Sequence, residues 1–254
     1  MRFAVVGKGG AGKSLLTGTL ARLFARRGQR VLALDSDPVP GLTFSLGADA
    51  PDDLLLEAAV ELGADRRWRF VPGVGPVRAV QRYATLAPDG VRLLQAGKTG
   101  PGGRPPMMST INAFYMIVHG LGSAAAFRDW VVLGDLPAGP YQMAYGWSAY
   151  AERFILVVEP TWQSMLTARR IKRIATAARA EIGLSLVVNK VTSPADTERV
   201  ATFLELPVHG AVPVDEGVRA AELEGVALLD FAPDGPAVSA VEQLTDRLLA
   251  DSLG

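Results

Sequence analysis

The 254-residue sequence contains no cysteine, and its two histidines, His119 and His209, lie far apart. The lack of thiols excludes disulfides, thiolate nucleophiles, Fe–S clusters and cysteine-based zinc sites. Two scattered histidines rarely form a metal site by themselves. We therefore expect no stoichiometric iron, zinc or nickel in this protein.

A surplus of either charge and long hydrophobic runs are also missing. The 26 basic residues balance 26 acidic ones, so no overall field attracts nucleic acid or an anionic membrane, and such a partner would need a local patch. No signal-peptide pattern follows Met1, and no apolar run approaches the roughly 20 residues of a spanning helix. We expect a cytoplasmic protein without a membrane partner.

The chain is long enough to bury one core, because it has 254 residues and 49% of them are apolar. We therefore predict a single domain over 1–254.

Short apolar runs alternate along the chain with longer stretches of helical periodicity. Runs that are apolar throughout are typical of parallel strands buried on both faces. The alternation predicts an α/β fold with a doubly wound, mostly parallel sheet flanked by helices. The predicted strands are 3–6, 30–34, 91–95, 130–133, 154–158, 184–188 and 208–212, and the predicted helices are 13–27, 161–182, 195–204 and 236–249.

The least regular part of the sequence runs from about residue 48 to 106. Its stretches 71–76 and 97–106 are rich in glycine and proline, which is typical of loops. We interpret it as a variable insertion that carries a partner or effector surface. The alternative is a mobile surface loop without a role.

A glycine-rich loop with the sequence GKGGAGKS follows the first predicted strand and opens the first predicted helix. This context is that of a P-loop, in which backbone amides and a helix N-terminus surround phosphates. Lys13 is expected to reach the β- and γ-phosphates and Ser14 to ligate Mg²⁺. The sequence thus predicts a P-loop NTPase fold that binds ATP or ADP with Mg²⁺. The predicted phosphate-binding residues are Gly9, Gly10, Ala11, Gly12, Lys13, Ser14 and Leu15.

Three aspartates follow predicted strands at the edge of the sheet where ligands bind in open α/β folds. Asp35 and Asp37 come after the second strand, and Asp135 comes after strand 130–133. Asp135 is predicted to hold a magnesium-bound water and to act in a loop that responds to the γ-phosphate. Turn formation around Pro38 is the alternative for the first two, and helix capping is the alternative for Asp135.

Two later segments are candidates for the base-binding end of the site. Asn189 ends strand 184–188 with an amide that can both donate to and accept from the adenine edge. Pro213 and Asp215 follow strand 208–212. A Pro-x-Asp turn into a helix also has an ordinary capping explanation, so this second assignment stays open.

Lys8 adds a second lysine at the start of the loop, and the resulting KGGxGKS pattern is similar to the signature of the deviant Walker class. That class contains the ParA and MinD partition ATPases, the arsenite and tail-anchored-protein ATPases, the nitrogenase iron protein and the nickel-insertion ATPase of carbon monoxide dehydrogenase. The resemblance implies a homodimer in which Lys8 contacts the partner's phosphates, like an arginine finger supplied in trans. It also implies that Asp37 positions the attacking water, that Asp35 supports the metal shell and that the segment around Pro213 wraps the base.

Later motifs resemble the nickel-insertion ATPase and the iron protein more than the partition ATPases. Segment 157–160 with 170–174 resembles the former, and segment 133–139 resembles the second switch of the latter. Met107, Met108 and Ala138 stand where the metal-binding cysteines of these proteins are expected. Methionine can contact a soft metal, but two methionines that open an apolar helix more often serve packing. The resemblance therefore implies a nucleotide-driven dimer without a thiolate metal centre.

The leading hypothesis is an ATPase that couples dimer rearrangement to action on a client protein. One alternative is a ParA- or MinD-type positioning ATPase, and another is a nucleotide-sensing module that no longer hydrolyses ATP. The basic residues of segment 161–182 are able to touch phosphates, although a solvated face also explains them. The C-terminal helix carries acidic residues opposite its apolar face, which disfavours an anionic-membrane anchor. The basic residues in question are Arg169, Arg170, Lys172, Arg173 and Arg179.

Overall fold

The computed structural model describes residues 1–37, 41–49, 56–97 and 108–251. Its main sheet has eight strands in the order β10-β9-β8-β1-β7-β2-β6-β5. All neighbouring pairs are parallel except the β5–β6 edge pair. This sheet confirms the predicted fold class and contains every predicted strand. In chain order the strands are β1 (Arg2–Gly7), β2 (Arg30–Asp35), β5 (Thr85–Leu86), β6 (Arg92–Gln95), β7 (Trp130–Asp135), β8 (Arg153–Val158), β9 (Gly183–Val191) and β10 (Val208–Pro213).

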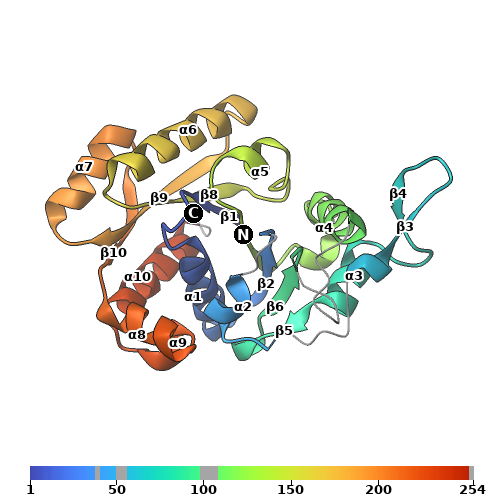
Figure 1. Ribbon diagram of the computed structural model, residues 1–254, viewed down its shortest axis with the longest axis horizontal. Helices are drawn as coiled ribbons and strands as arrows, with labels where there is room; N and C mark the ends of the chain where they lie inside the picture. The colour runs from blue at the N-terminus through green and yellow to red at the C-terminus, as the bar shows by residue number, and fades with distance from the viewer. Residues whose placement is uncertain (38–40, 50–55, 98–107, 252–254) are drawn as a thin grey trace.

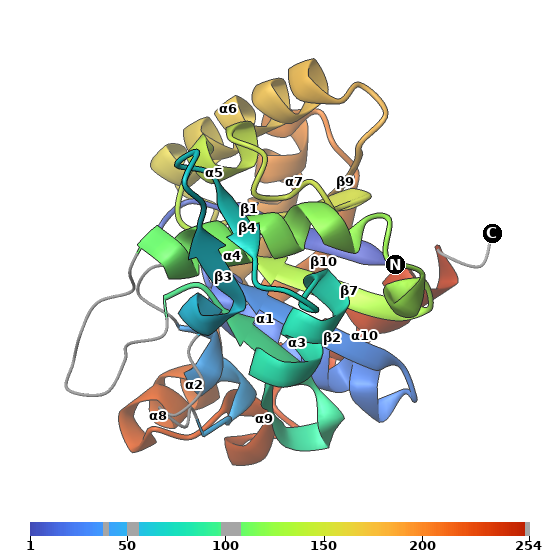
Figure 2. The ribbon, with the colours of Figure 1, turned by 90° about the vertical axis from the view of Figure 1, so that its right-hand side faces the viewer.

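Helices cover both faces of this sheet (Figure 1; Figure 2 shows the molecule from the side). One face is covered by α1 (Lys13–Arg26), α2 (Leu42–Leu46), α8 (Glu216–Glu224), α9 (Leu228–Phe231) and α10 (Pro236–Ala250). The other is covered by α3 (Pro76–Tyr83), α4 (Met108–Leu121), α5 (Tyr141–Ala144), α6 (Trp162–Ala178) and α7 (Pro194–Leu204). The predicted helices are confirmed, but α6 ends at Ala178 rather than at 182, because the chain becomes extended at Arg179 before it enters β9.

The core consists of two apolar layers, one on each side of the sheet. Along β1, Phe3 and Val5 join the layer under α1 and α10, whereas Ala4 and Val6 join the layer under α4 and α6. Successive strand side chains point to opposite faces, so a strand covered on both sides must be apolar at every position. This is the physical reason for the continuous apolar runs in the sequence.

The described part of the predicted insertion is more ordered than its sequence indicates. It contains a 3-10 turn (Leu56–Ala59), an antiparallel hairpin of β3 (Val60–Leu62) and β4 (Trp68–Phe70), and α3 before the chain joins the main sheet at β5 and β6. The hairpin extends from the body of the protein beside α4 (Figures 1 and 2). Strands of three residues are too short for a periodicity signal, so the sequence missed them. Residues 98–106 of the predicted loop lie outside the described residues.

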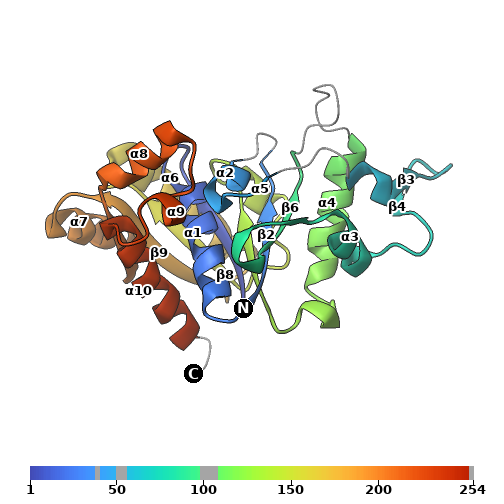
Figure 3. The same ribbon diagram turned by 90° about the horizontal axis from the view of Figure 1, so that it is seen from below.

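The amino and carboxyl ends of the parallel strands lie on opposite sides of the molecule, which we call the two edges of the sheet. Met1 and the end of α10 lie at one edge, while α2 and α8 lie at the other, beyond the carboxyl ends of the strands (Figure 3). The turn after β1 and the loops after β2 and β7 are at this second edge, where ligands bind in open α/β folds. No helix in the described ranges is long and apolar enough to cross a membrane.

Candidate functional site

The loop between β1 and α1 is bent by glycines in left-handed conformations. Gly10 has φ 79° and Gly12 has φ 90°, which residues with a Cβ adopt only at a cost. Gly12 is the N-cap residue of α1, and no side chain caps the helix there. The first-turn amides of a helix lack intrahelical partners, so this N-terminus is suited to an anion.

Lys13, the first residue of α1, has only 8% of its surface exposed. Its Nζ donates to the carbonyl of Lys8 at 3.3 Å. Burial lowers the pKa of Lys13, and the carboxylates of Asp135 and Asp37 oppose this effect. The ammonium therefore lies in a site where a further anion, such as a phosphate, would stabilise its charge.

Ser14 and Asp135 meet directly beneath the loop, although they are 121 residues apart in the sequence. The Ser14 hydroxyl donates to Oδ2 of Asp135 at 2.5 Å. Asp135 is 2% exposed, and its Oδ1 is buried without a hydrogen-bond partner among the described residues. Burial raises the pKa of Asp135 to about 6, while the Ser14 hydroxyl and Lys13 act in the opposite direction. An unpartnered carboxylate oxygen beside a hydroxyl fits the oxygen-ligand chemistry of Mg²⁺.

The described residues contain no cluster of three or more histidine, cysteine, aspartate or glutamate side chains that could hold a metal by themselves. Mg²⁺ does not need such a cluster, because it keeps several waters and is held through one or two protein ligands together with substrate phosphates.

Asp35 is fully buried at the end of β2, and both of its carboxylate oxygens accept backbone hydrogen bonds. Oδ1 accepts from the amide of Asp37 at 3.1 Å and Oδ2 from the amide of Leu42 at 3.0 Å. Burial, with the nearby Asp135 charge, raises the pKa of Asp35 to about 7. This geometry favours the turn-forming alternative over direct metal ligation. Asp37 is partly buried, and its carboxylate acts electrostatically on Lys13.

The loops after β2 and β7 are joined by hydrogen bonds that the sequence analysis did not anticipate. The amide and the hydroxyl of Ser36 donate to the carbonyl of Asp135 at 3.1 and 2.7 Å. Gln142 of α5 donates from Nε2 to the carbonyl of Ser36 at 3.3 Å. Ser36 and Gln142 are 106 residues apart and belong to no recognisable motif, so no sequence signal could have paired them.

A cavity of about 530 Å³ joins the P-loop to the base-binding candidates. Asn189, Pro213 and Asp215 line it together with Phe44 of α2, which the sequence analysis did not identify. The predicted loop residues that also line it are Gly10, Gly12, Lys13, Ser14 and Leu15. The structure therefore brings both predicted halves of a nucleotide site to one cavity.

Within this cavity Asn189 and Asp215 have different surroundings. Asn189 is 8% exposed, donates from Nδ2 to the carbonyl of Ala11 at 2.8 Å and accepts from the amide of Lys190. Asp215 accepts from the amides of Gly217 at 2.8 Å and Ala237 at 2.9 Å, and is the N-cap of α8. The capping alternative for Asp215 thus has direct geometric support, whereas Asn189 lies against the P-loop itself.

Lys190 is a further site residue that the sequence analysis did not assign. Its backbone is in the left-handed region with φ 60°, a conformation that costs free energy for a residue with a side chain. Its Nζ donates to the carbonyl of Gly10 at 2.8 Å and pairs with Glu159 Oε1 at 2.5 Å. Lys190 thereby ties the phosphate loop to the loop after β8.

Lys8 lies at the more exposed end of the P-loop, where its Nζ donates to the carbonyl of Gly9 at 3.3 Å. Ala138 is exposed and adjacent to Gly9. Met108, the first residue of α4, is 64% exposed, so of the two packing roles expected for it, in a core or at an interface, the core of this chain is excluded. Met107 lies outside the described residues.

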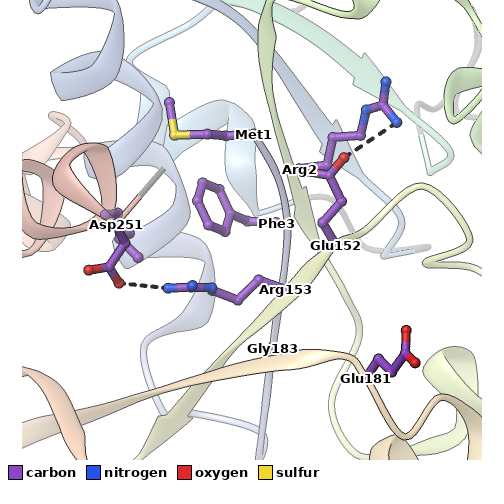
Figure 4. Close-up of a pocket in the computed structure, with 9 residues that line it drawn as sticks. Met1, Arg2, Phe3, Glu152, Arg153, Glu181, Gly183 and Asp251 are labelled. Carbon is purple, nitrogen blue, oxygen red and sulfur yellow. Dashed lines mark hydrogen bonds and ion pairs between the residues drawn. The ribbon is translucent and has the colours of Figure 1, made fainter. Parts of the chain in front are cut away.

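A second cavity, of about 440 Å³, lies at the opposite edge of the sheet (Figure 4). Four of its charged side chains form two pairs: Arg2 with Glu152 at 3.6 Å, and Arg153 with Asp251 at 2.7 Å. It shares no lining residue with the P-loop cavity.

The glycine-rich loop follows a central strand of a parallel sheet, and it is accompanied by a buried lysine at the start of α1 and by the Ser14–Asp135 pair. These features define a P-loop nucleotide-binding protein of the deviant Walker class. Residues 3–229 match the CobQ/CobB/MinD/ParA nucleotide binding domain, and the chain belongs to this family.

Similar proteins cover nearly the whole chain. An uncharacterised ATP-binding protein of Methanocaldococcus jannaschii is 28% identical over 89% of this chain and 90% of its own length. The carbon monoxide dehydrogenase accessory protein CooC of Rhodospirillum rubrum is 27% identical over 92% of this chain and 91% of its own. The septum site-determining protein MinD of Pyrococcus horikoshii, solved with Mg-ADP, has a TM-score of 0.72 at 19% identity and covers 100% of this chain and 98% of its own. This last likeness shows the fold alone.

Proposed function

We propose that this protein is an ATP-binding and ATP-hydrolysing homodimeric switch of the cytoplasm that acts on a client protein, as metallocentre-maturation ATPases do, but without a thiolate metal site. The Ser14–Asp135 pair beside Lys13 carries this proposal, because it combines the two oxygen ligands for Mg²⁺ with a buried cation for the phosphates. Similarity to CooC over nearly the whole chain supports the maturation branch. The absence of cysteine separates this chain from thiolate chemistry.

In this proposal the loop from Gly9 to Gly12 and the first-turn amides of α1 bind the phosphates, and Lys13 neutralises their charge. Mg²⁺, when bound with the nucleotide, supplies charge neutralisation at the phosphates. Ser14 and Asp135 would hold it, with the unpartnered Oδ1 of Asp135 as the free ligand atom. Opening the short Ser14–Asp135 hydrogen bond frees both groups for this purpose.

Asp37 is assigned the positioning of the attacking water, because it lies at the same edge of the sheet as Lys13 and Asp135 and acts electrostatically on both. Asp35 is assigned a supporting role, in which it fixes the turn that carries Asp37. Asn189 is assigned to the adenine edge, and Pro213 with the α8 N-terminus that Asp215 caps forms the opposite wall of the cavity.

Lys8 is assigned to the partner's nucleotide. Its Nζ donates to the carbonyl of Gly9 in the exposed part of the loop, and Lys8 is not among the residues that line the cavity. A contact that needs both chains and the γ-phosphate gives ATP a higher affinity for the closed dimer than for the open state, as any switch requires.

Light scattering with ADP and with a non-hydrolysable ATP analogue tests the switch. The analogue should drive dimer formation in the wild type and in a control Arg128→Ala variant, whose exposed arginine precedes β7 at the opposite edge of the sheet. Lys8→Ala should stay monomeric and lose about 10³-fold in turnover, by analogy with fingers supplied in trans. A monomer that hydrolyses ATP equally well with and without Lys8 would contradict the mechanism.

A positioning ATPase is the second candidate, supported by the likeness of the fold to MinD and ParA structures and by the exposed arginines Arg170 and Arg173 of α6. A nucleotide-sensing module without hydrolysis is the third. Measuring hydrolysis and dimerisation separately in the wild type distinguishes this third function from the first, since only a true switch shows both.

A further inference from the structure

The basic side chains of α6 fall into two groups in the structure. Arg169, Lys172 and Arg179 each contact an aromatic ring or a backbone carbonyl of this chain. Arg170 and Arg173 are exposed, and neither has a hydrogen-bond or ion-pair partner among the residues that the structure describes. The basic face noted in the sequence thus reduces to two arginines that are available to a partner.

Both of these arginines line a cavity of about 740 Å³ between α5 and α6, which we name the α5–α6 groove (Figure 1 shows the two helices side by side). Ala144, Ile174 and Ala177 supply apolar surface in it. Tyr141 and Tyr145 also line it and are 72% and 70% exposed. Two large aromatic side chains so exposed on one short helix and at its end indicate a surface that contacts a partner.

This combination matches the surfaces at which proteins contact one another. Tyrosine and arginine are enriched among the residues that contribute most to protein–protein affinity. Guanidinium groups bind carboxylates through charge-assisted hydrogen bonds, and the apolar part of the groove favours an apolar side chain. A nucleic-acid backbone is usually bound through several lysines or arginines, whereas this groove contains two arginines and the net charge of the chain is zero.

We infer that the α5–α6 groove binds a segment of the client protein in which an apolar side chain is flanked by aspartate or glutamate. The inference deepens the proposed function, on which it rests, by naming the surface that the client contacts and the chemistry of the contacting segment.

The groove is connected to the phosphate site through hydrogen bonds. Gln142 of α5 donates to the carbonyl of Ser36, and Ser36 donates to the carbonyl of Asp135, whose side chain pairs with Ser14. A movement of the Asp135 backbone on nucleotide binding would therefore be transmitted to α5 through these hydrogen bonds. Because nucleotide and client bias the same element, each changes the affinity of the other by the same factor.

Fluorescence anisotropy with two labelled peptides, Glu-Glu-Leu-Phe-Glu-Glu and Lys-Lys-Leu-Phe-Lys-Lys, tests the inference on the full chain. The acidic peptide should bind the wild type, with an affinity that differs between ADP and the ATP analogue, and the basic peptide should not bind. In Arg170→Glu/Arg173→Glu the affinity should fall at least about tenfold, since a hydrogen bond to a charged group contributes about 1.5–3 kcal/mol. In the control variant Arg128→Glu, which reverses the charge of one exposed arginine outside the groove, the affinity for the acidic peptide should be unchanged.

Four outcomes would overturn the inference. The first is equal affinity of the wild type for both peptides, and the second is no binding of the acidic peptide up to about 1 mM. The third is unchanged affinity of the double variant for the acidic peptide. Duplex DNA or anionic vesicles that bind the wild type and not the double variant would show a phosphate-binding surface instead.

Light scattering separates this inference from the proposed switch. The double variant should keep nucleotide-dependent dimerisation and turnover, and their loss would mean that a second copy covers the groove. Failure of the switch itself appears in the wild type, as turnover or dimerisation that does not depend on nucleotide or on Lys8.

Discussion

Replacing Gly12 by alanine should damage the site far more than the same change at Gly10. Both residues have left-handed backbone conformations, with φ 90° and 79°, so each alanine adds a backbone strain of about 1–2 kcal/mol. A Cβ at Gly10 meets no atom within 4 Å, whereas one at Gly12 lies 2.3 Å from Nδ2 of Asn189. This side chain cannot move away without losing its hydrogen bond to Ala11.

The overlap adds about 1–3 kcal/mol of overpacking and the lost hydrogen bond about 1 kcal/mol. The expected loss in the free energy of unfolding is therefore about 1–2 kcal/mol for Gly10→Ala and about 3–6 kcal/mol for Gly12→Ala. Urea unfolding of the nucleotide-free protein measures both values, and Gly10→Ala serves as the matched control for backbone strain.

A double-mutant cycle assigns the difference to Asn189. The side-chain amide is absent in Asn189→Ala, so Gly12→Ala should cost no more than about 1–2 kcal/mol in that background. Calorimetry with Mg-ADP should show weaker binding for Gly12→Ala, since the new methyl group lies in the wall of the nucleotide cavity. Equal destabilisation by the two glycine substitutions, or a cost at Gly12 that Asn189→Ala leaves unchanged, would refute the reasoning.

Four further predictions concern charge and metal. Lys13→Ala should abolish tight MgATP binding in calorimetry, because it removes the buried cation of the phosphate site; an unchanged affinity would mean that backbone amides suffice. Asp37→Ala should bind ATP normally but hydrolyse it roughly 10² times more slowly in a steady-state assay, because water positioning acts in the transition state; equal losses of binding and rate would indicate a structural role. The Asp35 pKa of about 7 lies above its unfolded value, so the stability that this group contributes is present at low pH and falls as the pH rises from about 4 to 7, and Asp35→Asn should flatten this part of the urea-unfolding profile; identical slopes would contradict it. Elemental analysis should find no full equivalent of iron, zinc or nickel, since the chain has no thiolate.

The sequence predicted the sheet, and it predicted a phosphate loop of which five residues line one cavity in the structure, because both features lie in contiguous residues. The strands are apolar at every position since helices cover both of their faces, and this pattern needs no knowledge of the partner strands. The segment from Gly7 to Ser14 contains the turn, the buried lysine and the hydroxyl of one site within one loop. A P-loop can therefore be recognised from the sequence alone.

Sequence reasoning was weaker where one residue type serves two purposes. An aspartate after a strand is equally suited to bind a metal and to accept backbone hydrogen bonds, and only the positions of Leu42 and Ala237 reveal that Asp35 and Asp215 do the latter. The hairpin β3–β4 was missed for a related reason, because its short strands depend on packing against α4 rather than on their own periodicity.

The sequence by itself determined the class of protein and the absence of thiol groups, since these follow from local spacing and from composition. The tertiary structure decided which distant groups come together: Asp135 bonds to Ser14, Gln142 bonds to Ser36, and two tyrosines of the α5 region line one groove with two arginines of α6. Such pairs form because parallel strands bring their carboxyl ends to one edge, whatever their separation along the chain. The chemistry of these pairs depends on residues from several segments, so it cannot be predicted from one segment of the sequence.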